Sequence, residues 1–173
     1  MELVQTDRQK AETLGASLRH DSRKSFRRRR VIFALFLTAS ASMSVVALYQ
    51  LGIIKRLPDP PLPRFNSGKV TRSAKAYSLL GTPDAVLALG SYALTMALAA
   101  MGSPDRASEQ PLLPMAFAAK VGFDAVLGAR YAIDEWSKNR NLCFWCLIAT
   151  GAAIASVPLA IPEARTALRC LTV

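Results

Sequence analysis

The sequence predicts an all-α membrane protein: a four-transmembrane-helix bundle with an outer loop that carries a short interfacial helix. The main observation is three long windows without a charged side chain, because about 20 apolar residues suffice to cross a bilayer. These windows are residues 31–54, 85–104 and 141–162. The composition agrees, since the 173 residues are 51% hydrophobic and only 20% charged, with a net charge of +10. A disordered chain and a cysteine-rich disulfide scaffold are both excluded.

The first span, residues 31–54, follows a strongly basic segment. Arg23, Lys24 and the four consecutive arginines at residues 27–30 directly precede the uncharged window. Such a cluster holds its side of the span in the cytoplasm, so residues 1–30 are expected to be a cytosolic basic tail. No nucleic-acid partner is expected, because the basic run directly precedes a membrane span. The window is also too long for a cleaved signal peptide.

The outer loop between the first two spans has two parts. Residues 57–63 contain four prolines and are expected to be extended, because proline lacks an amide donor. Residues 70–80 have mixed apolar and basic spacing, which predicts a short amphipathic helix on the outer membrane face. The second span, residues 85–104, then begins next to Asp84, for which a helix N-cap is the favoured interpretation.

The third span, residues 111–133, is apolar apart from Lys120, Asp124 and Arg130. Lys120 and Asp124 are four residues apart, so they share one helix face and are expected to pair. A structural pair is favoured. A small transporter or channel that uses these two charges within the membrane ranks last among the functions considered.

The last part of the chain completes the topology. Residues 134–140 are expected to form an outer turn, residues 141–162 the fourth span, and residues 163–173 a cytosolic C-terminal tail. The protein is therefore predicted to be a multi-pass protein of the cell inner (plasma) membrane, with both termini cytoplasmic and the lipid bilayer as its first partner.

Cys143 and Cys146 form a C-x-x-C at the start of the fourth span, on the predicted outer side. Two helical residues three apart have Cα atoms about 5 Å apart, within disulfide reach. The helix N-terminus also favours the thiolate of Cys143. A redox-active pair is favoured over two passively packed cysteines. No metal is expected, because a structural zinc site needs four ligands, and His20 and Cys170 lie far away in the predicted topology.

At this point the chain resembles the vitamin K epoxide reductase family over residues 31–162. That family has four or five transmembrane helices, a horizontal half-helix in its outer loop, and a C-x-x-C at the outer end of its fourth helix. The loop here is similar to the family run N-C-x-K-V…S…Y…G-x-P. It carries Asn66, Ser67, Lys69, Val70, Ser73, Tyr77, Gly81 and Pro83, followed by Gly90 and Tyr92 in the second span.

The resemblance implies an integral membrane thiol–disulfide oxidoreductase that uses a quinone of the menaquinone or ubiquinone type as co-substrate. Cys146 would react with the quinone and Cys143 would exchange disulfides. Ser73 would lie near the active centre, and Asp84 near a position whose side chain bonds a quinone carbonyl. The other expected quinone-binding residues are Asn66, Phe144, Trp145 and Thr150. Phe144 and Trp145 are alternatively interfacial anchors.

The sequence departs from the family pattern at two points. Ser67 stands where the family has its second loop cysteine, and no cysteine occurs from residue 2 to residue 142. Thr150 stands where the family has a quinone-contacting tyrosine. Because serine cannot relay electrons and no thioredoxin-like domain is expected in the chain, the expected partner is a separate thioredoxin-like thiol protein on the outer side. The alternative is a non-catalytic membrane subunit or scaffold that has lost redox activity.

Overall fold

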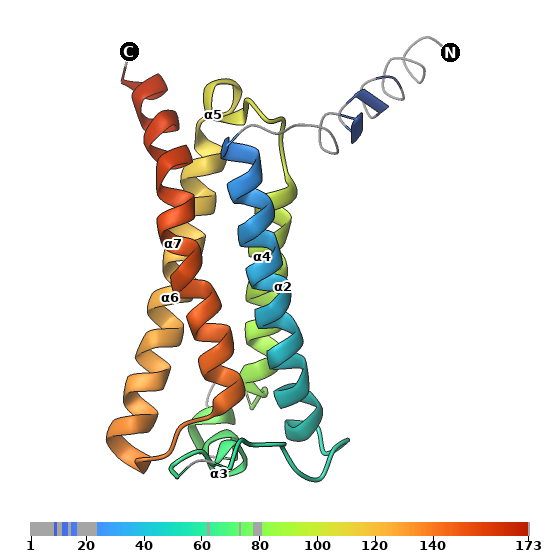
Figure 1. The fold of residues 1–173 in the computed structure, drawn as a ribbon, viewed down its shortest axis with the longest axis vertical. Helices are drawn as coiled ribbons and strands as arrows, with labels where there is room; N and C mark the ends of the chain where they lie inside the picture. The colour runs from blue at the N-terminus through green and yellow to red at the C-terminus, as the bar shows by residue number, and fades with distance from the viewer. Residues whose placement is uncertain are drawn as a thin grey trace.

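Four long helices run along one axis and form an upright bundle (Figure 1). They are α2 (Lys24–Gln50), α4 (Asp84–Ala100), α6 (Leu112–Asn139) and α7 (Phe144–Leu171). The structure is a computed structural model. It describes residues 9, 12–13, 15–16, 24–61, 63–72, 74–77 and 81–172. No β-strand occurs in these residues, so the predicted all-α class is confirmed.

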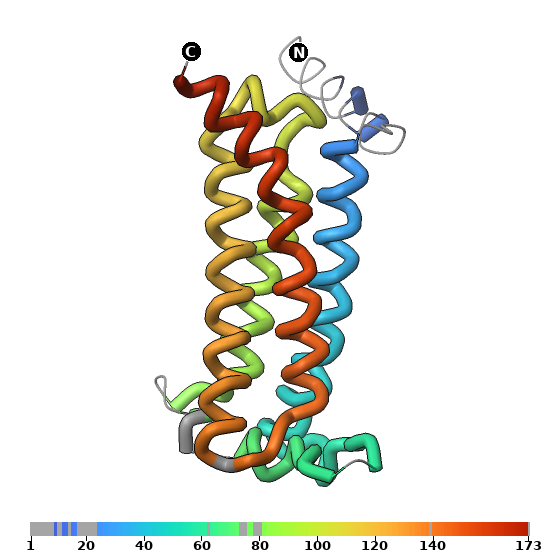
Figure 2. Tube along the Cα trace, turned by 60° about the vertical axis from the view of Figure 1, so that its left-hand side comes forward, coloured from blue at the N-terminus to red at the C-terminus, as the bar shows by residue number. Residues whose placement is uncertain are grey.

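Successive long helices run in opposite directions (Figure 2). α2 begins and α7 ends at one end of the bundle, where α5 (Arg106–Glu109) links α4 to α6 (Figure 1). We call this the arginine end, after the buried Arg29 and Arg106. The opposite end holds α3 (Ser67–Thr71), the 3-10 helix η1 (Ala74–Tyr77) and the C-x-x-C, and we call it the disulfide end.

The core lies between α2 and α4, between α2 and α7, and between α6 and α7. Many of its members are small, among them Ala39, Ala99 and Ala149, which allow helix backbones to approach closely. Phe36 of α2 and Tyr92 of α4 pack edge to face, with ring centroids 5.4 Å apart. α4 contacts α6 much less extensively than it contacts α2, and a cavity lies between α4 and α6.

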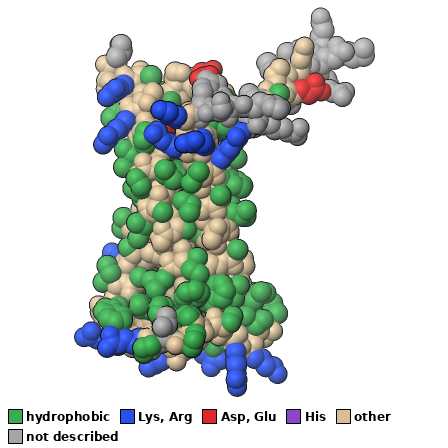
Figure 3. Space-filling model, in the orientation of Figure 1, with side chains coloured by type: hydrophobic (Ala, Val, Ile, Leu, Met, Phe, Trp, Pro, Cys, Tyr) green, Lys and Arg blue, Asp and Glu red, His purple; other side chains and the backbone are tan. Residues whose placement is uncertain are grey.

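Three of the described helices, α2, α6 and α7, are long and apolar enough to cross a membrane. α4 is apolar but has 17 residues, which corresponds to about 25 Å of helix and is short for a bilayer core. Lys and Arg side chains gather at the two ends of the face in Figure 3, with mostly uncharged side chains between them. These features are typical of a multi-pass membrane protein, and the fourth span remains a prediction.

The ends of the first two long helices differ from the predicted ones. α2 begins at Lys24 and includes the four arginines assigned to the tail, because arginine is a good helix former. It ends at Gln50 rather than at residue 54, because Gly52 has a φ of 77°, a left-handed conformation that ends helices. α4 ends at Ala100 rather than at residue 104, and Gly102 has a φ of 80°.

The last two helices run further than predicted. α6 continues to Asn139 through the expected turn at residues 134–140, and Arg140 then adopts a left-handed conformation with a φ of 51°. α7 continues through Pro158 and Pro162 to Leu171, so most of the predicted C-terminal tail is helical. Membrane helices tolerate proline where other groups bond the freed carbonyls. Pro158 and Pro162 remove the amide donors to the carbonyls of Ile154 and Pro158, respectively.

Two buried arginines hold the arginine end together. Arg29 is 2% exposed and donates to the carbonyls of Ala99, Met101 and Ser103 at 2.9, 2.6 and 3.1 Å. Carbonyls at a helix C-terminus otherwise lack partners, so a side chain of α2 caps α4. Arg106 pairs with Glu163 of α7, with Nε–Oε1 and Nη2–Oε2 distances of 2.7 and 3.1 Å.

The outer loop covers the start of α7. The described residues among 57–63 form no helix, as predicted. The single helix predicted over residues 70–80 is instead divided, because α3 ends at Thr71 and η1 begins at Ala74. Asn66 caps α3, since its side-chain oxygen accepts from the backbone N–H of Lys69 at 2.9 Å. The placement of this segment on a membrane surface remains a prediction.

Candidate active site at the C-x-x-C pair

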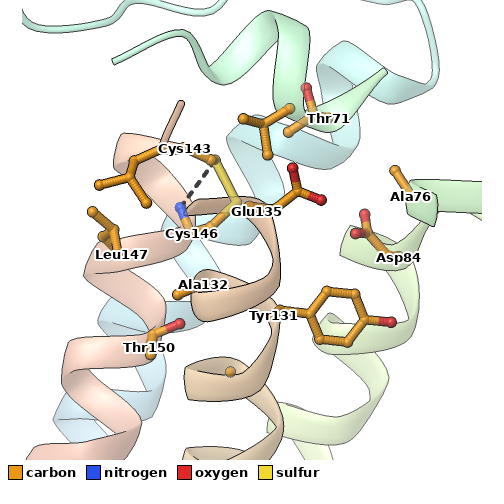
Figure 4. Close-up of a pocket in the computed structure, with 13 residues that line it drawn as sticks. Thr71, Ala76, Asp84, Tyr131, Ala132, Glu135, Cys143, Cys146, Leu147 and Thr150 are labelled. Atoms are coloured by element: carbon orange, nitrogen blue, oxygen red, sulfur yellow. Dashed lines mark hydrogen bonds between the residues drawn. A yellow bond between two sulfur atoms is a disulfide. The ribbon is translucent and has the colours of Figure 1, made fainter. Parts of the chain in front are cut away.

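Cys143 and Cys146 are joined by a disulfide at the start of α7, with Cα atoms 5.2 Å apart, so their predicted spacing is confirmed. Cys143 is the N-cap of the helix, and its sulfur accepts from the backbone N–H of Cys146 at 3.2 Å (Figure 4). In the reduced pair the same N–H and the helix dipole would stabilise a thiolate on Cys143. Cys143 is only 3% exposed.

The outer loop is fastened directly to the segment that precedes Cys143. The backbone N–H of Leu142 donates to the carbonyl of Arg64 at 2.9 Å, and that of Asn66 donates to the carbonyl of Leu142 at 3.2 Å. The rings of Phe65 and Phe144 pack edge to face, with centroids 6.0 Å apart. The loop therefore acts as a cover over the disulfide.

Ser67 occupies the centre of this cover. Its hydroxyl donates to one carboxylate oxygen of Asp59, and its backbone N–H donates to the other at 2.8 Å. The same hydroxyl oxygen accepts from the backbone N–H of Phe144 at 3.0 Å. Ser67 is fully buried. The residue at the family's loop-cysteine position thus lies directly beside the residue that follows Cys143.

Two cavities adjoin the pair and share wall residues. The smaller has a volume of about 50 Å³ and the larger about 260 Å³. Both are lined by Asp84, Gly128, Tyr131, Cys146 and Thr150. Cys143 lines only the smaller cavity, on the side of the cover. The larger cavity extends between α4 and α6 as far as Ser91 and Asp124.

Two of the predicted quinone-binding residues lie in these walls. Thr150 faces both cavities from α7, and Asp84 faces them from the start of α4. The prediction that Asp84 is an N-cap is wrong, because Pro83 occupies that position and Asp84 is the first helical residue. The Asp84 carboxylate instead accepts from the side-chain amide of Gln50 at 2.7 Å.

The other predicted site residues lie elsewhere. Phe144 and Trp145 line neither of the two cavities. The Trp145 indole N–H donates to the carbonyl of Pro58 at 3.1 Å, so this ring holds the loop. Asn66 caps α3, away from the cavity walls. Ser73 lies outside the described residues, so its expected place near the active centre remains a prediction.

Several wall residues were not singled out from the sequence. Tyr131 extends from α6 into the cavity together with Glu135 (Figure 4). Gly128 lets α6 approach α7 closely, since a Cβ there would lie 2.9 Å from the Thr150 hydroxyl oxygen. Their helical spacing could have indicated these wall residues, because residues 124, 128, 131 and 135 fall on one helix face.

The model of the Vitamin K epoxide reductase family matches residues 30–161, well over half of the chain. The chain belongs to this family. No curated protein and no solved structure gives a match.

Membership of the vitamin K epoxide reductase family confirms the predicted resemblance and identifies a membrane protein of a thiol–disulfide oxidoreductase type. Members of this family use quinones. No group of three or more potential metal ligands is found among the residues that the structure describes.

Proposed function

We propose that this protein is an integral membrane oxidoreductase that couples the Cys143–Cys146 pair to a membrane quinone of the menaquinone or ubiquinone type. In the net reaction two thiols and a quinone give a disulfide and a quinol, with transfer of two electrons and two protons. One observation carries the proposal. Cys146 lines the large cavity, whereas Cys143 does not and faces the loop.

The large cavity suits a quinone head group. An apolar cavity of about 150 Å³ already accommodates benzene, and this one measures about 260 Å³. Leu87 and Leu127 belong to its wall and are 38% and 40% exposed, which supports an opening between α4 and α6 toward lipid. Tyr92 and Tyr131 belong to the same wall, and Thr150 stands where the family has a tyrosine.

Cys143 would exchange with a separate thioredoxin-like protein at the disulfide end, which we place on the outer side of the plasma membrane. No cysteine from residue 2 to residue 142 can mediate this transfer. Because Cys143 is almost fully buried, the partner can reach it only when the outer loop that covers the disulfide moves away. The basic residues 27–30 at the opposite end favour the cytoplasmic placement of that end.

Quinol formation by the protein in lipid nanodiscs, with a dithiol as the electron donor, tests the proposal. We expect Cys146→Ser and Cys143→Ser each to reduce the rate to that of the uncatalysed reaction, because one sulfur cannot complete an internal disulfide. Cys170→Ser is the matched control and should turn over like the wild type, since Cys170 is an exposed free cysteine in the last turn of α7. A wild type without turnover would favour the non-catalytic scaffold.

A further inference from the structure

The far end of the large cavity, toward the arginine end, is formed by a polar cluster. Asp124 is 3% exposed, and both it and Ser91 belong to the cavity wall. Lys120 Nζ lies 2.6 and 2.7 Å from the two carboxylate oxygens of Asp124, so the predicted pair is confirmed. Lys120 Nζ also donates to the Ser91 hydroxyl at 2.8 Å, and Ser91 donates to Asp124 at 2.7 Å.

This cluster and Cys146 lie at opposite ends of the cavity. Gly128 of α6 packs against Thr150 of α7. Cys146 lies one helical turn from Thr150 toward the disulfide end, and Asp124 lies one turn from Gly128 toward the arginine end. At 1.5 Å per residue, the two groups are about 12 Å apart along the bundle axis. A ring held against Cys146 would therefore direct its far oxygen toward Ser91 and Asp124.

Reduction of a quinone requires a proton at each of its two oxygens. A quinone oxygen near Cys146 would have Asp84 and Tyr131 beside it, whereas the far oxygen would lie between α4 and α6 at the level of Ser91 and Asp124. Among the described residues of the cavity wall, Ser91 and Asp124 are the polar groups at that depth other than the Tyr92 phenol. The thiol protons are released about 12 Å away, so a local donor is needed there.

We propose that Lys120, acting through the Ser91 hydroxyl, supplies the proton to the quinone oxygen that points away from Cys146. This inference rests on the proposed function. The two electrons come from the cysteine pair. The Ser91 O–H bond breaks as an O–H bond forms on the quinone, and Lys120 transfers one proton to the Ser91 oxygen. A proton from water then restores the ammonium group. Asp124 positions Lys120 and Ser91.

Stability alone does not require this pair. A buried ion pair loses much of its Coulomb energy to desolvation, and well-packed apolar replacements of both partners are often neutral or stabilising. The pair also has access to the cavity, because Asp124 and its hydrogen-bond partner Ser91 both belong to the cavity wall. A role in the cavity explains that placement.

The test compares the wild type with the charge-free double variant Lys120→Met/Asp124→Leu in lipid nanodiscs. We expect the variant to fold, and its kcat with a short-chain ubiquinone to fall about 100-fold, the usual contribution of general acid catalysis. The KM for quinone and the rate at which a dithiol reduces the disulfide should stay within a few-fold of wild type. Ser91→Ala should slow quinol formation similarly.

Ser156→Ala is the matched control for Ser91→Ala, because Ser156 is a buried serine of a long helix that donates to the carbonyl of Ala152 at 2.8 Å and is not part of the cavity wall. Its turnover should equal that of the wild type. If the double variant folds and reduces quinone as fast as the wild type, the proton-donor role alone is overturned. If the wild type itself gives no quinone-dependent oxidation of its cysteines, the proposed function fails and this inference with it.

Discussion

The Arg106→Met variant is expected to lose about 3–5 kcal/mol of unfolding free energy, the cost of removing one partner of a buried ion pair. Arg106 is fully buried and pairs with Glu163, whose carboxylate would be left in the bundle without its cation. Its guanidinium also donates to the carbonyls of Leu98 and Met101 at 2.6 and 2.8 Å. One side chain thus connects α4, α5 and α7.

Chemical unfolding of the purified protein in mixed micelles, followed by circular dichroism, measures this loss. Arg165→Met is the control, because Arg165 is an exposed arginine on the same helix two residues after Glu163. Its effect should stay within about 0.5 kcal/mol. The double variant Arg106→Met/Glu163→Leu should recover part of the loss, since it leaves no unpaired charge. A loss below about 1 kcal/mol for Arg106→Met would contradict the role of Arg106 in connecting α4, α5 and α7.

The second large effect is expected from Ser67→Cys. The introduced thiol would lie beside Cys143, because the Ser67 oxygen is already 3.0 Å from the backbone nitrogen of Phe144. We expect it to attack the sulfur of Cys143, forming a new disulfide and releasing Cys146 as a thiol. Loss of the hydrogen bond to Asp59 costs about 2 kcal/mol, but closing a loop of this size stabilises by about 4 kcal/mol.

Mass spectrometry of the digested, alkylated protein reports this exchange directly. Peptides containing residues 67 and 143 should appear cross-linked, with Cys146 alkylated, in most molecules after brief treatment with a limiting dithiol. Ser67→Ala is the control and should retain only the disulfide between Cys143 and Cys146. If Ser67→Cys also shows only that disulfide, the loop does not hold residue 67 within reach of Cys143, and the described cover is incorrect.

Uncharged windows in the sequence indicated where the helices lie but not where they end. The ends depend on long-range contacts and on backbone conformation. Arg29 was interpreted as one member of a basic cluster, yet it caps α4 through carbonyls about 70 residues further along the chain. Arg106 and Glu163 are 57 residues apart, and no local pattern connects them. Gly52 is a single residue whose left-handed conformation shortens α2.

The candidate site was only partly predictable, because part of its geometry is local in the sequence and part depends on contacts between distant segments. The spacing of Cys143 and Cys146 is local, so the helix geometry followed from the sequence. Tyr131 and Gly128 required knowing which face of α6 turns toward α7, and helical spacing from Asp124 could have indicated it. The separate roles of Phe144 and Trp145 depend on where residues 58 and 65 of the loop pack, and nothing in the sequence around residue 144 specifies that.

The redox state of Cys143 and Cys146 in membranes tests the central proposal most directly. In a Cys170→Ser background only the pair can react with a maleimide mass tag. Membranes are treated with a dithiol, freed of it, exposed to quinone or buffer, quenched in acid and denatured for tagging. We predict two tags per chain after the dithiol and buffer, and none after quinone. A pair that keeps both tags in the presence of quinone, or that the dithiol never reduces, would contradict quinone-coupled redox chemistry.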